Sequence, residues 1–183
     1  MELLSIGRFS RLSGLSTKAI DGRETVMETR SESLTADEHR RLGIDLFNKT
    51  WMLMERSDRT PEEDDELLHC AHASAYHWLQ AGTIVNRVRS EWQCSRMYTV
   101  LGHAQPALRH ARRCLELAES APGELEEFDL PFAYEAMARA HALAGDEVEA
   151  REWFARANTA SADVADEDDR AILEADLASI FPS

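Results

Sequence analysis

The sequence predicts an all-α protein in which antiparallel helix pairs stack as a short solenoid, closed by a C-terminal capping helix. Three observations predict it. Residues 35–180 are rich in Ala, Leu, Glu and Arg, which are strong helix formers. Helix-start signals are explicit, and small residues recur at a fixed spacing after two glycines. No segment shows a convincing strand pattern, so helices have to supply the whole core.

Two helix starts are marked by a Thr followed three residues later by a Glu. Thr35 precedes Glu38, and Thr60 precedes Glu63. In such a capping box, the hydroxyl and the carboxylate accept hydrogen bonds from first-turn amides that have no partner within the helix. Pro61 strengthens the second signal, because its fixed backbone angle suits the first helical position. Helices are therefore expected to begin directly after Thr35 and Thr60.

Five further helices are expected around residues 86–101, 107–118, 131–144, 150–157 and 173–180. Glycines follow the second, third and fifth helices at positions 82, 102 and 145, where a glycine commonly ends a helix. The 107–118 segment places its small and apolar residues on one narrow face, as helical spacing requires. These residues are Ala107, Leu108, Ala111, Cys114, Leu115 and Ala118.

The two glycines also begin a repeated pattern. Ala107 follows Gly102 by five residues (107 − 102), Ala150 follows Gly145 by five (150 − 145), and the glycines are 43 residues apart (145 − 102). Later small or aromatic positions continue in step in both segments. Small residues at such positions let antiparallel helices approach closely, so the pattern predicts repeated helix pairs.

This pattern resembles the tetratricopeptide repeat (TPR), although its period exceeds the usual ~34 residues. The resemblance is clear over about residues 86–160, whereas residues 35–82 fit only as a degenerate repeat. It implies a TPR-like solenoid whose last helix is a cap over the final apolar face. An Ala-rich helical bundle without repeats is the alternative.

The resemblance also implies that the first helix of each pair lines a concave groove. The residues mapped to it are Arg89, Trp92, Arg96, Phe132, Glu135 and Arg139, with Trp51, Phe47 and Asn48 extending the surface. Guanidinium groups pair well with carboxylates. We therefore expect a non-catalytic adaptor or sensor that binds a peptide, a protein segment or a small acidic ligand. In the alternative interpretation, the arginines pair with neighbouring acidic residues and Trp92 belongs to the core.

A histidine-rich helix offers candidate metal ligands. Glu66 and His69 form a Glu-x-x-His unit that resembles the units of carboxylate-bridged iron bundles, and His72 lies one turn further on. Such bundles need a second unit, and the sequence contains none. The preferred interpretation is that these are polar histidines at a helix–helix boundary. No metal or other cofactor is assigned, and a metal-binding helical protein is kept as an alternative function.

No catalytic residues are assigned either. The sequence lacks a phosphate loop, a dinucleotide fingerprint and a nucleophile elbow. Cys94 and Cys114 lie in helical apolar stripes, where a cysteine usually acts as a small core residue. The expected role is therefore binding rather than catalysis.

The formal net charge of −14 argues against direct contact with DNA or with an anionic membrane, because both surfaces are negative. No apolar run approaches the ~20 residues of a membrane span, and the first residues lack the features of a signal peptide. Three cysteines without close pairing argue against a disulfide framework. A cytoplasmic protein with a protein or peptide partner is expected, and a homodimer is an open alternative.

The N-terminal segment differs from the rest. Residues 4–20, from Leu4 to Ile20, resemble the start of the MerR family of transcription regulators, with the helix-turn-helix turn at Gly14. The family pattern breaks off at Asp21, and no wing follows. Residues 1–34 are therefore interpreted as an arm carrying a truncated helix-turn-helix, and residues 35–183 as the helical repeat domain. A ligand-responsive, MerR-derived regulator is the main functional alternative.

Overall fold

The computed structural model describes residues 33–181, and this part of the chain is built from α-helices without a strand. The predicted all-α fold is confirmed. The MerR-like segment lies outside the described residues. The helices are α2 (Ala36–Met54), α3 (Pro61–Ala81), α4 (Ile84–Val100), α5 (Ala104–Ser120), α6 (Asp129–Leu143), α7 (Glu147–Ser161) and α8 (Glu167–Ala178).

Both predicted capping boxes form. The Thr35 amide donates to the Glu38 carboxylate at 2.8 Å, and the Thr60 amide donates to that of Glu63 at 2.9 Å. Caps of this kind contribute about 1 kcal/mol each. The helix expected from residue 86 begins earlier, at Ile84. The reason is a further cap, in which the Thr83 amide donates to the Asn86 side chain at 3.0 Å.

The two repeat glycines close the first helices of successive pairs in the same way. Gly102 and Gly145 have φ values of +76° and +77°, a region that disfavours residues with a Cβ. After Gly102, the amide of His103 donates to the Tyr98 carbonyl at 2.9 Å. After Gly145, the amide of Asp146 makes the equivalent bond to His141 at 3.0 Å. These Schellman turns show that the sequence repeat is also a structural one.

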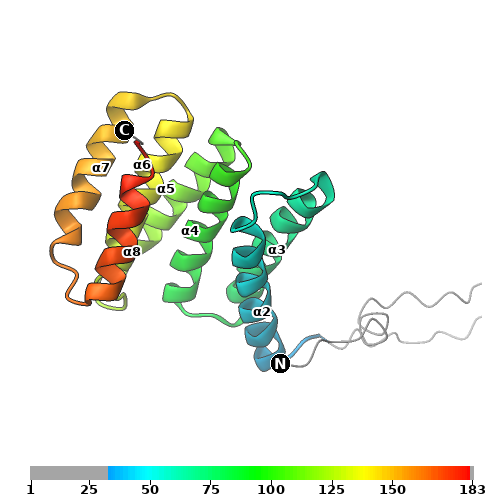
Figure 1. The fold of residues 1–183 in the computed structure, drawn as a ribbon. Coiled ribbons are helices and arrows are strands. Elements are labelled where there is room, and N and C mark those ends of the chain that lie inside the picture. Colours follow the sequence, from blue (N-terminus) through cyan, green and yellow to red (C-terminus); the bar gives the residue numbers. More distant parts are fainter. Residues whose placement is uncertain (1–32, 182–183) are drawn as a thin grey trace, which may run out of the picture. The chain divides into compact units, whose positions relative to one another are not determined.

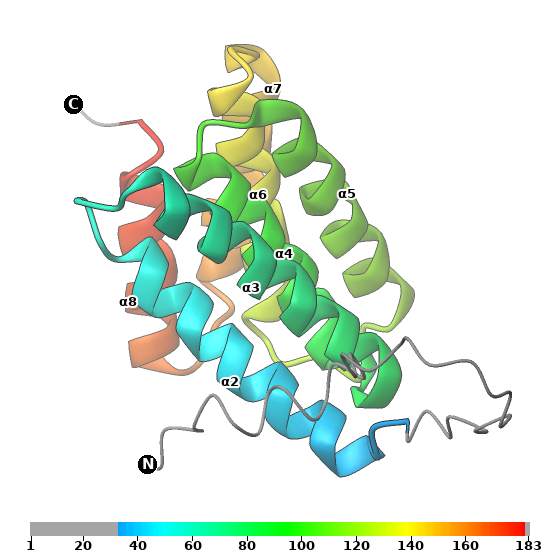
Figure 2. The ribbon, with the colours of Figure 1, turned by 90° about the vertical axis from the view of Figure 1, so that its right-hand side faces the viewer.

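The helices pack as three consecutive pairs, α2 with α3, α4 with α5 and α6 with α7 (Figure 1). The first helices of the pairs also contact one another, since α4 lies against both α2 and α6, and α8 continues the row beside α6. Figure 2 shows the same helical part of the chain from its side. Small buried residues on the facing surfaces permit this close packing. They are Ala107, Ala111, Cys114, Ala133, Ala136 and Ala140.

The final helix covers the end of the last pair, as expected for a cap. Leu173 and Leu177 of α8 are fully buried and form a small cluster with Ala157 of α7. Phe132 and Phe154 pack against the same cluster. The neighbouring side of α8, which carries Ile172 and Asp176, lies beside the row of first helices, where the polar contacts described below are made.

Candidate ligand groove

A cavity of about 200 Å³ lies on the row of first helices. Its walls come from α2, α4, α6 and α8 and from the residue that precedes α6. The lining residues that matter most are Trp51, Arg89, Trp92, Phe128, Phe132 and Ile172. Five predicted groove residues therefore share one hollow: Phe47, Trp51, Arg89, Trp92 and Phe132.

Aromatic rings form most of the wall. The ring centroids of Trp51 and Trp92 are 5.5 Å apart, and those of Trp92 and Phe132 are 5.4 Å apart in an edge-to-face arrangement. Phe128 meets Phe132 in the same way at 6.1 Å. Aromatic pairs in these geometries contribute about 0.5–1.5 kcal/mol beyond the area they bury. The wall is thus a packed aromatic surface, with each ring only partly buried.

Arg89 stands at one side of the cavity and is held by Asp129. Its Nε and Nη2 atoms donate to the two carboxylate oxygens at 2.8 and 3.0 Å. The guanidinium also lies 4.8 Å from the centre of the Phe128 ring. The hydrogen bonds to Asp129 raise the pKa of Arg89, so its positive charge is secure. The arginine remains 37% exposed and can still meet a ligand.

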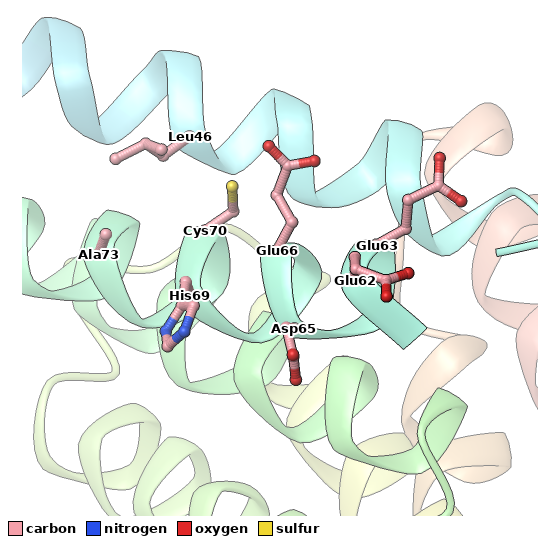
Figure 3. Close-up of a pocket in the computed structure, with 8 residues that line it drawn as sticks. All are labelled: Leu46, Glu62, Glu63, Asp65, Glu66, His69, Cys70 and Ala73. Atoms are coloured by element: carbon pink, nitrogen blue, oxygen red, sulfur yellow. The ribbon is translucent and has the colours of Figure 1, made fainter. Parts of the chain in front are cut away.

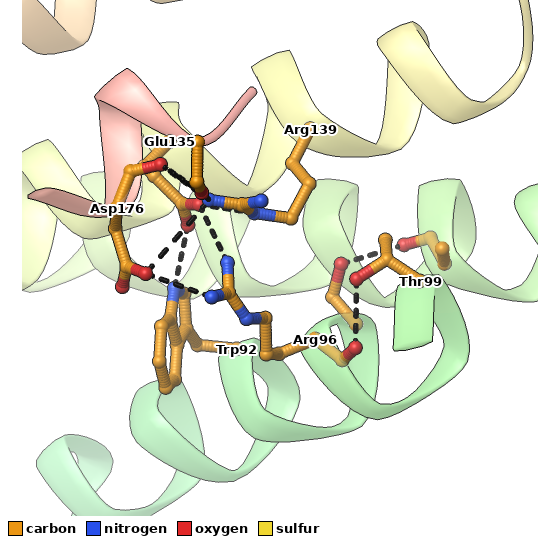
Figure 4. Close-up of polar contacts among 9 residues, drawn as sticks. Trp92, Arg96, Thr99, Glu135, Arg139 and Asp176 are labelled. Atoms are coloured by element: carbon orange, nitrogen blue, oxygen red, sulfur yellow. Dashed lines mark hydrogen bonds and ion pairs between the residues drawn. The ribbon is translucent and has the colours of Figure 1, made fainter. Parts of the chain in front are cut away.

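A second polar cluster is centred on the buried carboxylate of Glu135 (Figure 4). Arg96 donates to Glu135 at 3.2 Å, Arg139 donates at 2.5 Å, and the Trp92 indole donates at 3.2 Å. Buried charges have to be paired in this way to offset their loss of water. The predicted residues Arg96, Glu135 and Arg139 are thus brought together beside the aromatic cavity.

This pairing agrees with the alternative interpretation of the three groove arginines, because each already has an acidic partner within the chain. Trp92 is only half-buried, so it belongs to the groove wall as well as to the packing. Phe47 lines the cavity, whereas Asn48 is exposed and does not.

Two residues of the candidate site, Asp129 and Asp176, are not marked by any pattern in the sequence. Asp129 is 40 residues from Arg89, and Asp176 is 80 residues from Arg96. Asp129 begins α6, where an acidic residue also suits the helix dipole. Asp176 lies on the helix expected only as a cap, so nothing in the local pattern pointed to the groove.

The candidate metal ligands do not converge. Glu66 forms an ion pair with Lys49 of α2, and His72 contacts the Tyr98 hydroxyl at 2.7 Å. Glu66 and His69 both line an open hollow between α2 and α3, but Figure 3 shows the Glu66 side chain directed toward α2 and that of His69 away from it. Across residues 33–181, no group of three His, Cys, Asp or Glu side chains could hold a metal ion.

The cysteines are free and buried in the described part of the chain. Burial raises the pKa of Cys94 to about 12 and also raises the pKa of Cys114. A thiol with a raised pKa is a poor nucleophile at neutral pH, since the thiolate is the reactive form. These two residues fill the core, as their place in the apolar stripes predicts.

Within residues 33–181, no helix is both long enough and apolar enough to cross a membrane. Comparisons of the chain with protein-family models, with curated proteins and with solved structures found no match.

Proposed function

We propose that this chain is a non-catalytic binding protein whose groove takes one large apolar or aromatic side chain of a partner peptide or protein segment. The observation that carries the proposal is the aromatic cavity on the row of first helices. Its volume of about 200 Å³ is below the ~300–1,000 Å³ of typical small-molecule pockets. A hollow of this size suits a single anchoring residue or a small aromatic ligand.

The chemistry around the cavity supports recognition rather than reaction. The Glu135 carboxylate accepts three hydrogen bonds from Arg and Trp side chains, and Asp129 is paired with Arg89. Both carboxylates therefore already have partners within the chain. A half-exposed arginine beside an apolar hollow can instead orient a partner that carries an acidic group. The arrangement matches the binding role that the TPR resemblance implies.

The proposed partner is therefore a peptide or protein segment. A small aromatic ligand with an acidic group would offer the groove the same two features. The formal charge of −14 disfavours a nucleic acid in this groove. We place the protein in the cytoplasm because the three thiols are free, as a reducing compartment keeps them.

Selection from a random-peptide display library, followed by calorimetry on the enriched peptides, tests the proposal. Ile172→Trp fills the cavity from an exposed position and is expected to weaken binding at least about tenfold, or ~1.4 kcal/mol. Val148→Trp is the matched control, because it adds the same side chain at an exposed position of α7 outside the cavity. Enriched peptides without a shared large apolar residue, or binding equally weakened by both variants, would refute the proposal.

A further inference from the structure

The last helix reaches into the groove with polar groups. The Asp176 carboxylate accepts a hydrogen bond from Arg96 at 2.7 Å. Arg139 donates to the backbone carbonyl of Asp176 at 2.6 Å and to the Ser179 hydroxyl at 3.0 Å. Figure 4 shows Asp176 facing Arg96 from the opposite side of the cluster. Arg96 and Arg139 are therefore satisfied partly by α8 and by the residue that follows it.

The charges of this cluster balance only when α8 is in place. Arg96 and Arg139 carry two positive charges, while Glu135 supplies one negative charge and Asp176 the other. All four side chains are at most 19% exposed. An unpaired charge at such a site is costly because water cannot solvate it fully. Without Asp176, the groove would need a carboxylate from elsewhere.

Few buried apolar residues of α8 pack against the rest of the protein. The helix has 12 residues, and only Leu173 and Leu177 along it are buried. A helix this short is marginal on its own in water. Its groove-facing residues, Ile172 and Asp176, both line the cavity and lie one helical turn apart. Ile172 is more than half exposed, so it fills little of the hollow.

We propose that the partner is a short amphipathic segment with an apolar residue and a carboxylate four positions later, and that it displaces α8 from the groove. Its carboxylate takes the place of Asp176 against Arg96 and Arg139, while its apolar residue enters the cavity more deeply than Ile172 does. α8 is then a tethered competitor that sets the affinity of the groove. This inference rests on the proposed function and names the chemistry of its ligand.

A labelled synthetic peptide of residues 164–181 is the probe, added to the full-length chain. Asp176→Asn in the chain weakens the contact of its own α8 with Arg96. The peptide is therefore expected to bind this variant about tenfold more tightly than the unmodified chain, which corresponds to ~1.4 kcal/mol for one ion pair. Glu174→Gln is the matched control. It removes the same charge from an exposed position of the same helix and should leave peptide binding as in the unmodified chain.

The peptide itself provides the reciprocal test. A peptide that carries the same substitution is expected to bind the Asp176→Asn chain about tenfold more weakly than the unsubstituted peptide does. The reason is that it no longer offers a carboxylate to Arg96 and Arg139. Hydrogen exchange should also show faster exchange of the α8 amides in the Asp176→Asn chain and unchanged exchange in the Glu174→Gln chain. Equal peptide affinity of the two variant chains, or equal α8 exchange, would overturn the inference.

Two further outcomes separate this inference from the proposed function. If Asp176→Asn prevents folding, Ser179→Ala removes only one hydrogen bond from Arg139, and it must still speed α8 exchange for the inference to hold. If display-selected peptides lose affinity with Ile172→Trp but leave α8 exchange unchanged when bound, the cavity is a binding site and the displacement is refuted.

Discussion

Arg96 and Asp176 form an ion pair of 2.7 Å across the groove, although they are 80 residues apart in the chain. This contact ties the second helix pair to the final helix, while Glu135 of the third pair connects to the same arginine. Ion pairs as well as packing therefore connect the helices that form the groove, and the stability of this region depends on a few charges.

Glu135→Gln should destabilise the fold substantially. The substitution keeps the shape but leaves Arg96 and Arg139 facing one carboxylate instead of two, so we expect the free energy of unfolding to fall by about 2–4 kcal/mol. Urea denaturation measures it. Glu116→Gln on the exposed side of α5 removes an equal charge from a surface ion pair and should cost under ~0.5 kcal/mol. Equal losses in the two variants would mean that the buried cluster contributes nothing special.

Gly43→Ala should also destabilise, against the usual helical preference for alanine. A Cβ at this position would lie 2.8 Å from Cε2 of the Trp78 ring, and Trp78 is itself buried. Overpacking costs about 1–3 kcal/mol, whereas alanine gains only ~0.5–1 kcal/mol over glycine in a helix. A net loss of melting temperature is expected. A rise would show that the α2–α3 interface yields easily.

Gly102→Ala should cost about 1 kcal/mol because φ is positive there, while open space around the position excludes a clash. Gly102→Asn is expected to cost less, since Asn tolerates the left-handed region better. The same pair of substitutions at Gly145 should repeat these values, and the losses should add in the double variant. Chemical denaturation of the unmodified chain, the four single variants and the double alanine variant checks both points. Unequal costs at the two glycines would contradict the equivalence of the turns.

Histidine titration should make the protein less stable in mild acid. Burial lowers the pKa of His72, with the nearby His110 adding to the effect, and burial also lowers that of His77. The unfolded chain therefore binds more protons below its ordinary histidine pKa of ~6.5. Stability should be complete above that pH and should decrease as the pH falls through ~6.5 toward the lower folded values.

His72→Gln isolates this effect, because Gln does not titrate but can still bond to the Tyr98 hydroxyl. The slope of the unfolding free energy between about pH 5 and 6.5 should become shallower in this variant. His69→Gln on the exposed side of the same helix serves as the comparison. A slope that His72→Gln leaves unchanged would assign the acid sensitivity to other groups.

Local signals predicted the fold well. The capping boxes at Thr35 and Thr60 and the turns at Gly102 and Gly145 each act within about five residues, and each formed as expected. The small buried residues between the helices follow from helical periodicity, which can be recognised in a single sequence. Errors were confined to helix ends, where Asn86 is the third residue of α4, and its side chain accepts a hydrogen bond from the amide of the N-cap residue Thr83.

The groove could be predicted only in part. The tetratricopeptide resemblance mapped Arg89, Arg96 and Arg139 to the groove. Two of the acidic partners, Asp129 and Asp176, come from segments distant in the sequence. Periodicity does not say which acidic residue of a strongly acidic chain meets which arginine, so Asp129 and Asp176 were missed. The close approach of Gly43 to Trp78 was missed for the same reason, since it depends on how two helices meet rather than on either alone.

The matched turns at Gly102 and Gly145 have a consequence for how such a chain can grow. Because both first helices end in the same turn, we expect the stretch between them to act as an exchangeable cassette, a unit that can be inserted or removed with an equivalent turn at each end. Adding or deleting one cassette would lengthen or shorten the row of first helices without redesigning a junction. The number of arginines beside the cavity would then change in whole steps.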